Sequence, residues 1–364
     1  MLRRAFAVIG GLLFIGWSGI STLLVAAFAV LASPTSQAAE LTVGLVQLRT
    51  ADAGNFQVMK ALAVEAKKQG ASLVVYPEAS DLGWLNPSAF TEAEPIPGRY
   101  STAFAAIASE LGVWVAAGLT ERGPKAGPGS QANSFEAYDA GILIDPKGQI
   151  VIHHRQFNVV QNAFDPAACQ SILNQPQCSY SPGEKEDIKI TKTPFGRTAI
   201  LVCADAYTYP PAVALQQLKN LSPDLVIVPW GITAAAQNQC GAKDFNATGY
   251  ASEAASYLKS AFVVGANATG ERHYGRFLPS VYCGDSGYAT PSGEPVEAPA
   301  TGSAVVLIHI PDSFQAPTPL VINESSANEF CPAVCGSYAS NWNDQWTSDV
   351  GHGGSCGCTP NSGQ

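Results

Sequence analysis

Charged side chains are scarce in this chain of 364 residues. Asp, Glu, Lys and Arg make up only 13% of it, about half of the quarter that is usual in a soluble protein. Basic residues are the rarer kind, with 20 Lys and Arg against 29 Asp and Glu, so the formal net charge is −9. This balance argues against nucleic acid or an anionic membrane surface as the main partner. A hydrophobic content of 46% instead indicates a substantial core and excludes global disorder.

One long apolar run begins the chain. It spans residues 5–32, follows Arg3 and Arg4, and leads into small residues up to Ala39 that would suit a signal peptidase. The run is long enough to cross a bilayer, but polar residues and glycine at 16–22 interrupt it and leave 23–32 as an ordinary signal core. We predict that residues 1–39 are a cleaved signal peptide, with a retained membrane anchor as the alternative. Either interpretation places the rest of the chain outside the cytoplasm, as a secreted or extracytoplasmic protein.

The chain has nine cysteines, an odd number. In an exported protein this count suggests four disulfides and one free thiol. Cys203 is the one that lies in an apolar strand pattern, so it is our candidate for the free thiol. Two local disulfides are expected between cysteines that are near each other in the sequence. The four C-terminal cysteines could form either disulfides or a zinc cluster, and an oxidising compartment favours disulfides. These groups are Cys169 with Cys178, Cys240 with Cys283, and Cys331, Cys335, Cys356 and Cys358.

Short apolar runs alternate with segments of helical periodicity, which is typical of an α/β fold with a buried sheet. The chain after residue 323 is rich in cysteine, and we expect an irregular, stapled tail there. The predicted domains are therefore 1–39, 40–322 and 323–364. Strands are expected at 41–48, 71–76, 113–119, 140–145, 149–153, 199–203, 225–229, 261–265, 286–289 and 304–309, and helices at 55–69, 104–111, 211–219 and 249–260.

Chemically useful side chains follow three of these strands. Glu78 comes just after the strand at 71–76, His153 and His154 follow the hairpin at 140–153, and Cys203 ends the run at 199–203. In sheets of this kind, ligands collect at one set of strand ends. A thiolate attacks carbonyl carbons well, provided that a base removes its proton and donors hold the oxyanion. A buried Glu beside a Cys could be that base.

Several motifs in this order resemble the nitrilase superfamily of carbon–nitrogen hydrolases. The resemblance spans residues 41–310, and residues 210–215 with Gly83-Trp84 look most like the secreted vanin and biotinidase branch, which cleaves amides of pantetheine and biotin. The matching motifs are Val-Val-Tyr-Pro-Glu at 74–78, Asn133 with Leu-Ile-Asp-Pro-Lys-Gly at 143–148, Gly-Glu at 183–184 with Thr-Pro-Phe-Gly-Arg at 193–197, and Asp-Ser-Gly-Tyr at 285–288 with Pro-Ser-Gly at 291–293.

The resemblance implies an αββα sandwich, here a single domain with a disulfide-stapled C-terminal tail, and a catalytic Glu-Lys-Cys triad. Glu78 matches the glutamate and Cys203 the nucleophile, but Gln156 stands where the family has its lysine. That lysine stabilises the anionic intermediate in the family, and a glutamine amide donates a hydrogen bond without a charge. Losing one oxyanion donor typically costs on the order of 10²–10³ in rate. Arg155 is adjacent, but neighbouring strand residues face opposite sides, so it is a poor substitute.

The leading hypothesis is an exported amidase that needs no cofactor or metal and acts on a small-molecule amide. Cys203 would form a thioester, Glu78 would act as the base, and Gln156 with the Ala204 N–H would hold the oxyanion. The alternative is a catalytically impaired binding protein, because Gln156 replaces the lysine. We expect His153 and His154 to be strand-surface residues, and Trp84 and Trp230 to be pocket walls or core. Dimers are usual in the family, so a homodimer is a further expectation.

Overall fold

The structure is a computed structural model that describes residues 41–126, 134–297, 304–349 and 353–361. The predicted leader, 1–39, and Asn133 lie outside these ranges. All described elements belong to one compact unit, Ala39–Gln364. Within the described ranges, no helix combines the length and the apolar character needed to cross a bilayer.

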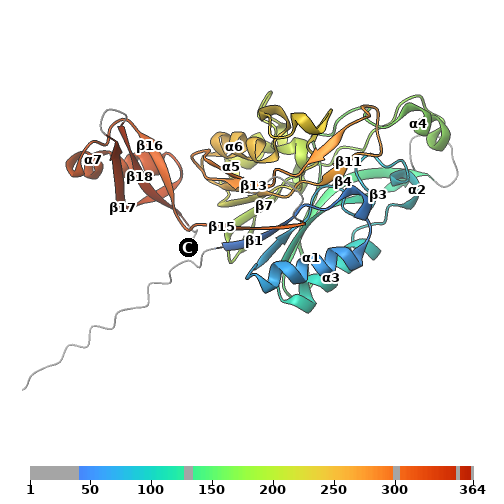
Figure 1. Cartoon of the computed structure of the whole chain (residues 1–364), viewed down its shortest axis with the longest axis horizontal. Coiled ribbons are helices and arrows are strands. Elements are labelled where there is room, and N and C mark those ends of the chain that lie inside the picture. Colours follow the sequence, from blue (N-terminus) through green and yellow to red (C-terminus); the bar gives the residue numbers. More distant parts are fainter. Residues whose placement is uncertain (1–40, 127–133, 298–303, 350–352, 362–364) are drawn as a thin grey trace, which may run out of the picture. The chain divides into compact units, whose positions relative to one another are not determined.

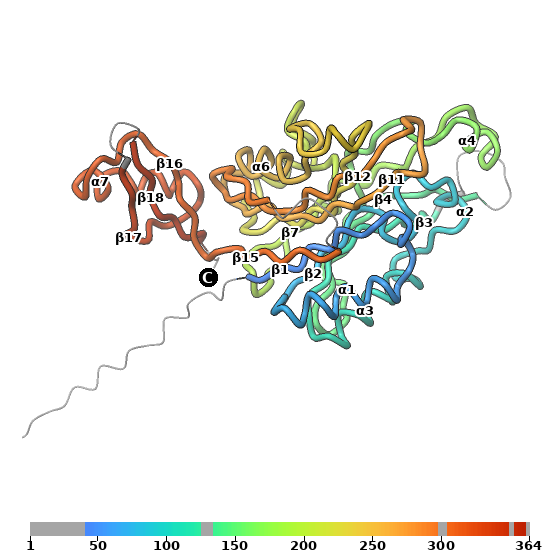
Figure 2. The backbone as a smooth tube through the Cα atoms, in the orientation of Figure 1, coloured from blue at the N-terminus to red at the C-terminus, as the bar shows by residue number. Residues whose placement is uncertain are grey.

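The first of two large sheets contains six strands in the order β15-β1-β2-β3-β4-β5. Strands β1, β2 and β3 run parallel, whereas β15, β4 and β5 add antiparallel edges. Figure 2 shows that β1 and β15 lie side by side although they come from opposite ends of the domain sequence. The strands are β1 Leu41–Val46, β2 Leu73–Val75, β3 Trp114–Ala126, β4 Phe135–Ile144, β5 Ile150–Arg155 and β15 Val305–Ile310.

The second large sheet has six strands in the order β14-β13-β10-β8-β7-β6, of which the central strands β10, β8 and β7 run parallel. A smaller sheet has three strands in the order β11-β12-β9. The bounds are β6 Thr191–Thr193, β7 Gly196–Ile200, β8 Leu225–Ile227, β9 Thr233–Ala234, β10 Phe262–Gly265, β11 Thr269–Glu271, β12 Val281–Cys283, β13 Gly287–Ala289 and β14 Pro295–Glu297.

Helices cover the outer faces of both sheets, which gives the predicted αββα sandwich (Figure 1). Helices α1 and α3 pack on the first sheet, and α5 and α6 pack on the second. The α-helices of this domain are α1 Phe56–Lys68, α2 Ala89–Glu92, α3 Arg99–Leu111, α4 Pro166–Leu173, α5 Val213–Leu221 and α6 Ala247–Leu258; short 3₁₀ helices are η1 Thr50–Asp52, η2 Lys185–Asp187, η3 Cys203–Ala206, η4 Gln237–Gln239 and η5 Lys243–Phe245.

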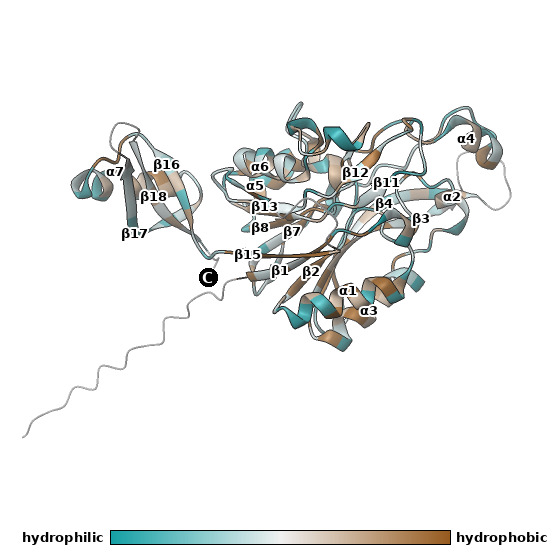
Figure 3. Cartoon of the chain, viewed as in Figure 1, coloured by the Kyte–Doolittle hydropathy of each residue, from teal (hydrophilic) through white to brown (hydrophobic). Residues whose placement is uncertain are grey.

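The sequence pattern explains these layers. Helix α1 starts where the Asn55 side chain accepts a hydrogen bond from the Val58 N–H, and it buries Met59 and Ala63 at helical spacing. Strands between two layers are buried on both faces, so they read as continuous apolar runs. Figure 3 shows this contrast, with brown strands inside and helices that are part teal and part brown.

The tail is more regular than the sequence suggested. Its helix α7 packs with a three-stranded antiparallel sheet of order β16-β18-β17, so the expectation of an irregular segment is wrong. Two disulfides join α7 to β18. Because these bridges hold the polar strands of the tail together, the strands show little hydrophobic periodicity, and the sequence pattern does not reveal them. The elements are β16 Phe314–Thr318, α7 Glu324–Gly336, β17 Ser340–Asp349 and β18 Gly353–Pro360.

Eight of the nine cysteines form four disulfides, and Cys203 is free. The two local pairs are the predicted ones. The four C-terminal cysteines pair as disulfides, so the staple is correct and the zinc alternative is wrong. The pairs are Cys169–Cys178, Cys240–Cys283, Cys331–Cys356 and Cys335–Cys358.

The Cys240–Cys283 bridge closes the longest loop, with a sequence separation of 43 residues. Replacing both cysteines with serine should lower the free energy of unfolding by about 4 kcal/mol, because the open loop gains entropy in the unfolded chain. Chemical denaturation measures the loss. The matched control is the Cys169→Ser/Cys178→Ser variant, whose loop separation is 9 residues and whose loss should be smaller. A larger loss in the control would contradict the loop-entropy argument.

Candidate active site

Glu78 lies just past β2, where Tyr76 and Pro77 end the strand. Its backbone N–H donates to the Trp230 carbonyl at 3.2 Å, which ties the end of the first sheet to the end of β8 in the second. Ala79 follows with a φ of 45°, so the chain turns sharply directly after the carboxylate. Glu78 itself is 6% exposed. Both sheets therefore hold this carboxyl group in a fixed, nearly water-free position.

Cys203 leaves the second sheet in the same region. It follows β7 and opens η3 with a φ of 39°, a left-handed conformation that costs energy for a residue with a side chain. The Cys203 N–H donates to the Pro229 carbonyl at 3.1 Å. Its Sγ lies 3.8 Å from the Tyr207 hydroxyl and receives a hydrogen bond from the Gly231 N–H. The turn thus directs one buried thiol away from the strand and toward donors.

The structure brings the Glu78 carboxyl group and the Cys203 thiol together, close enough for each to shift the pKa of the other. Gly231 makes this approach feasible. A Cβ atom at that position would stand 1.8 Å from Glu78 Oε2, so any side chain there would displace the carboxylate. A glycine is therefore required next to the Glu78–Cys203 pair.

Asp139 is a third buried group of this site, and the sequence interpretation missed it. It lies on β4 with 0% exposure, and its carboxyl group is close enough to that of Glu78 for each to shift the pKa of the other. Neither of its carboxyl oxygens has a hydrogen-bond partner among the described residues. One feature of the sequence could have pointed to Asp139: it is the charged residue within the otherwise apolar segment Ala-Tyr-Asp-Ala-Gly-Ile-Leu-Ile at 137–144.

Burial controls the protonation of the three groups. It raises the pKa of Glu78 to about 7, while the neighbouring Asp139 and Cys203 oppose the rise. Burial and the neighbouring Glu78 raise the pKa of Asp139 well above its usual range. Burial and Glu78 also raise the pKa of the Cys203 thiol. Asp139 is therefore the acid that keeps its proton, and the thiol needs a base to ionise at neutral pH.

Gln156 lies beside the turn that carries Cys203 and is 2% exposed. Its Nε2 donates to the Val202 carbonyl at 3.1 Å, and its backbone N–H donates to the Asp139 carbonyl at 2.7 Å. Arg155 points elsewhere, as strand alternation predicts, and its guanidinium pairs with Glu121 at 2.6 Å. No lysine in the described part of the chain is buried. Gln156, the residue that the resemblance aligns with the family's lysine, is thus held against the turn that carries Cys203.

His154 is fully buried, which corrects the expectation that it is a surface residue. Its Nε2 lies 2.7 Å from Asp205 Oδ2, and the other oxygen of Asp205 accepts the N–H groups of Phe157 and Asn158. Asp205 is the second residue after Cys203, so these hydrogen bonds join the segment that carries Gln156 to the turn that carries Cys203. His153 is partly exposed and lies 2.8 Å from Glu121 Oε2.

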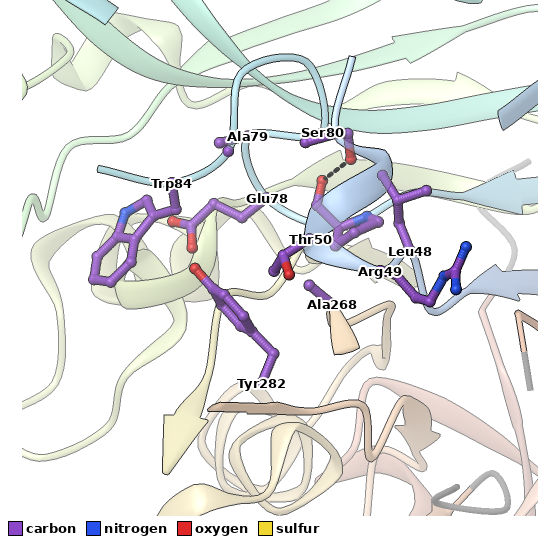
Figure 4. Close-up of a pocket in the computed structure, with 12 residues that line it drawn as sticks. Leu48, Arg49, Thr50, Glu78, Ala79, Ser80, Trp84, Ala268 and Tyr282 are labelled. Atoms are coloured by element: carbon purple, nitrogen blue, oxygen red, sulfur yellow. Dashed lines mark hydrogen bonds between the residues drawn. The ribbon is translucent and has the colours of Figure 1, made fainter. Parts of the chain in front are cut away.

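A small cavity opens against Glu78 (Figure 4). Its volume of about 20 Å³ has room for about one water molecule. Trp84 forms one wall, as the sequence allowed, and the Tyr282 hydroxyl points toward the Glu78 carboxyl group. Trp230 is instead buried in the core. The lining residues include Leu48, Arg49, Thr50, Ala53, Gly83 and Ala268.

The thiol and the carboxyl group are the reactive groups of this arrangement. In the part of the chain that the structure describes, no group of three or more His, Cys, Asp or Glu side chains is positioned to hold a metal ion. The arrangement pairs a protonated thiol with a buried carboxylate whose pKa is about 7. Such a pair can transfer a proton and form a covalent bond to a carbonyl carbon.

Solved structures share the fold. A mutant of the amidase from Nesterenkonia AN1, described as a member of the nitrilase superfamily, superposes with a TM-score of 0.55 at 18% identity, covering 75% of this chain and 91% of that one. Another structure of this amidase, with the same TM-score at 17% identity, covers 76% of this chain and 92% of that one; it is described as showing covalent addition of the acetamide moiety of fluoroacetamide at the active-site cysteine.

Curated relatives match over shorter segments. Deaminated glutathione amidase of Rattus norvegicus is 26% identical over 155 residues, 42% of this chain and 44% of that protein. Formamidase of Bacillus cereus strain Q1 is 32% identical over 106 residues, 28% of this chain and 29% of that protein. The chain thus spans less than half the length of these relatives. The family model for carbon–nitrogen hydrolases matches residues 42–314, and the chain therefore belongs to the carbon–nitrogen hydrolase family.

Proposed function

We propose that this chain is an exported thiol hydrolase of non-peptide amide bonds, in which Cys203 is the nucleophile and Glu78 the general base. The observation that carries the proposal is the close approach of the Glu78 carboxyl group and the Cys203 thiol in a buried site, where each shifts the pKa of the other. A base with a pKa of about 7 is well matched to proton transfer near neutral pH.

The reaction divides into two halves. Glu78 takes the thiol proton, the sulfur forms a C–S bond with the amide carbon, and the carbonyl electrons move onto oxygen. When this intermediate collapses, the C–N bond breaks and the amine leaves with the proton from Glu78. Glu78 then takes a proton from water, the hydroxide attacks the thioester, and the C–S bond breaks to release the acid while the proton returns to sulfur.

The oxyanion needs donors, because its charge develops where water is excluded. The Ala204 N–H and the Gln156 amide are the groups that we assign to it. One Gln156 N–H already donates to the Val202 carbonyl, so the second hydrogen of the same nitrogen remains to serve the oxyanion. Protonated Asp139 supports the base, since its proximity to Glu78 limits the rise in the pKa of Glu78.

Small amides are the proposed substrates. The relatives named above include a formamidase and a deaminated glutathione amidase. The likeness of 210–215 and Gly83-Trp84 to the vanin and biotinidase branch stays a prediction. The four disulfides are compatible with export, while cleavage of the leader, membrane anchoring and homodimerisation are proposals for direct measurement.

The proposal is tested by intact-mass analysis of purified protein during incubation with a panel of small amides, with ammonia or amine release followed in parallel. We expect a transient mass gain equal to the acyl group, localised to Cys203, together with continuous release of amine. A mass gain that persists without turnover would show that the thioester forms but water cannot hydrolyse it. The absence of both signals for every amide would refute the proposal.

A second function is motivated by Gln156 alone: a catalytically impaired relative that uses the pocket for binding. The Gln156→Lys variant separates the two. Under our proposal, the native protein is already active and the variant changes its kcat/KM by less than the 10²–10³-fold that a whole oxyanion donor provides. Steady-state amide hydrolysis measures both proteins. An inactive native protein with an active Gln156→Lys variant would establish the binding function instead.

A further inference from the structure

Arg272 is a buried cation without an acidic partner. It directly follows β11 and is 6% exposed, and no other Lys or Arg in the described ranges is buried. Its Nη2 donates to the Phe277 carbonyl at 2.7 Å, but its Nε has no hydrogen-bond partner. Its guanidinium takes part in no ion pair with the described acids. Burying a charge without a counter-ion is costly, so this arrangement calls for an explanation.

The position of Arg272 connects it to the candidate active site. Its guanidinium lies over the Trp84 ring, 5.5 Å from the centroid. Trp84 and Tyr282 line the cavity that Glu78 faces (Figure 4). Tyr282 is also close enough to both Arg272 and Glu78 for each to influence its pKa. Arg272 is therefore separated from the catalytic carboxyl group by one layer of aromatic side chains.

A second unpartnered polar group lies at the base of the same hairpin loop. Ser280 immediately precedes β12, and its carbonyl accepts the Arg272 N–H at 2.9 Å. The Ser280 Oγ is buried and has no hydrogen-bond partner. A guanidinium N–H and a hydroxyl are both donors toward anionic oxygen. Two unused donors on neighbouring, hydrogen-bonded backbone positions point to a ligand with an anionic oxygen group.

The surrounding charges favour the same ligand. The loop after Arg272 carries His273 and Arg276 and no acid before Asp285, although the whole chain has a net charge of −9. Burial lowers the pKa of Arg272, which is the penalty that a bound anion would remove. Glu78 would repel an anion at the reacting end of the pocket, so the anionic group must sit away from the scissile bond.

We propose that Arg272, together with Ser280, binds a carboxylate of the substrate, so that the enzyme acts on small amides that carry a carboxylate beyond the scissile bond. The proposal deepens the proposed amidase function and rests on it. A planar carboxylate matches the fork of a guanidinium, and such charge-assisted hydrogen bonds are stronger than neutral ones. Arg272 and Ser280 lie outside the lining of the cavity beside Glu78, so such a substrate would extend past Trp84, with its amide at Cys203 and its carboxylate at Arg272.

Two amides of equal length test the selectivity: succinamate, which ends in a carboxylate, and 4-methylpentanamide, which ends in an uncharged isopropyl group. We expect the native protein to prefer succinamate. Arg272→Gln should lower kcat/KM for succinamate about 10- to 100-fold through KM and leave 4-methylpentanamide nearly unchanged. Arg276→Gln is the matched control, because it removes an exposed cation of the same loop, and it should alter neither substrate. Equal losses for both amides in Arg272→Gln would mean a merely structural role and overturn the proposal.

Binding gives a readout that does not need turnover. Calorimetry with succinate should show binding to the native protein and at least tenfold weaker binding to Arg272→Gln. If Arg272→Gln does not fold, Ser280→Ala takes its place, and it should also weaken binding of succinate and raise KM for succinamate alone. Succinate that binds both proteins equally would refute the subsite. Binding of succinate without hydrolysis of any amide would instead refute the amidase function and leave the subsite supported.

Discussion

Replacing Cys203 with alanine is expected to abolish amide hydrolysis, lowering the rate on the order of 10⁴-fold or more. The reason is that the proposed reaction has no route around the thioester: the sulfur forms the bond that replaces C–N. The acyl adduct seen by intact mass should disappear at the same time. Alanine removes one buried sulfur atom and introduces no bulk at this site, where Cys203 is 4% exposed, so the fold should stay intact, which a denaturation curve can check.

Tyr207→Phe is the matched control for this experiment. It removes a hydroxyl that lies 3.8 Å from the sulfur but leaves the nucleophile and the base in place. We expect this variant to keep the acyl adduct and most of the activity. Residual hydrolysis by Cys203→Ala at the native rate would show that another group does the chemistry, and an adduct on that variant would identify where.

Replacing Glu78 with glutamine should lower kcat/KM by about 10²- to 10⁴-fold, the range of general-base catalysis. Glutamine keeps the shape of the side chain and its hydrogen-bonding capacity but cannot take a proton. In the native protein, kcat/KM should rise with pH and level off above about 7, because the base acts only when ionised and the pKa of Glu78 is about 7. The variant should lose this step. An unchanged pH profile would remove Glu78 from the role of base.

Stability gives an independent check on the same residue. The pKa of Glu78 in the fold lies above its ordinary value of 4.5, so the folded chain holds the proton more tightly than the unfolded chain does. Its contribution to stability is therefore fully present below pH 4.5 and is lost as pH rises through about 7. Glu78→Gln has no such loss, so the Tm of the variant minus the Tm of the native protein should increase between pH 4.5 and pH 8. A Tm difference that does not change with pH would contradict the raised pKa of Glu78.

The layers of the fold were predictable because the strands between two layers are continuous apolar runs. The run at 71–76 is β2 and the run at 261–265 is β10, each within a few residues, since every side chain there must be apolar. Strands of two or three residues, such as β9 and β11, have too little pattern to find. The tail strands β17 and β18 were missed for another reason: disulfides supply the stability that a hydrophobic pattern would otherwise signal.

The candidate site was predictable only in part. Glu78 and Cys203 stand where a strand ends and the sequence becomes polar, so the chemistry that each residue offers is visible in the sequence. Asp139 and His154 lie within strands, and only the facing sheet decides whether such residues meet solvent or another polar group. His154 meets Asp205 from the second sheet at 2.7 Å. That partner is 51 residues away in the chain, a distance that no local pattern covers.

The free thiol has a consequence for the way this protein acquires its disulfides. Disulfide exchange proceeds through a thiolate that can reach another sulfur. Cys203 is 4% exposed, and burial raises the pKa of its thiol, so in the folded protein it is a poor partner for the eight paired cysteines. The folded protein is thereby protected from scrambling its own bridges. The order of events during maturation then matters, because Cys203 is shielded only after the two sheets have closed over it.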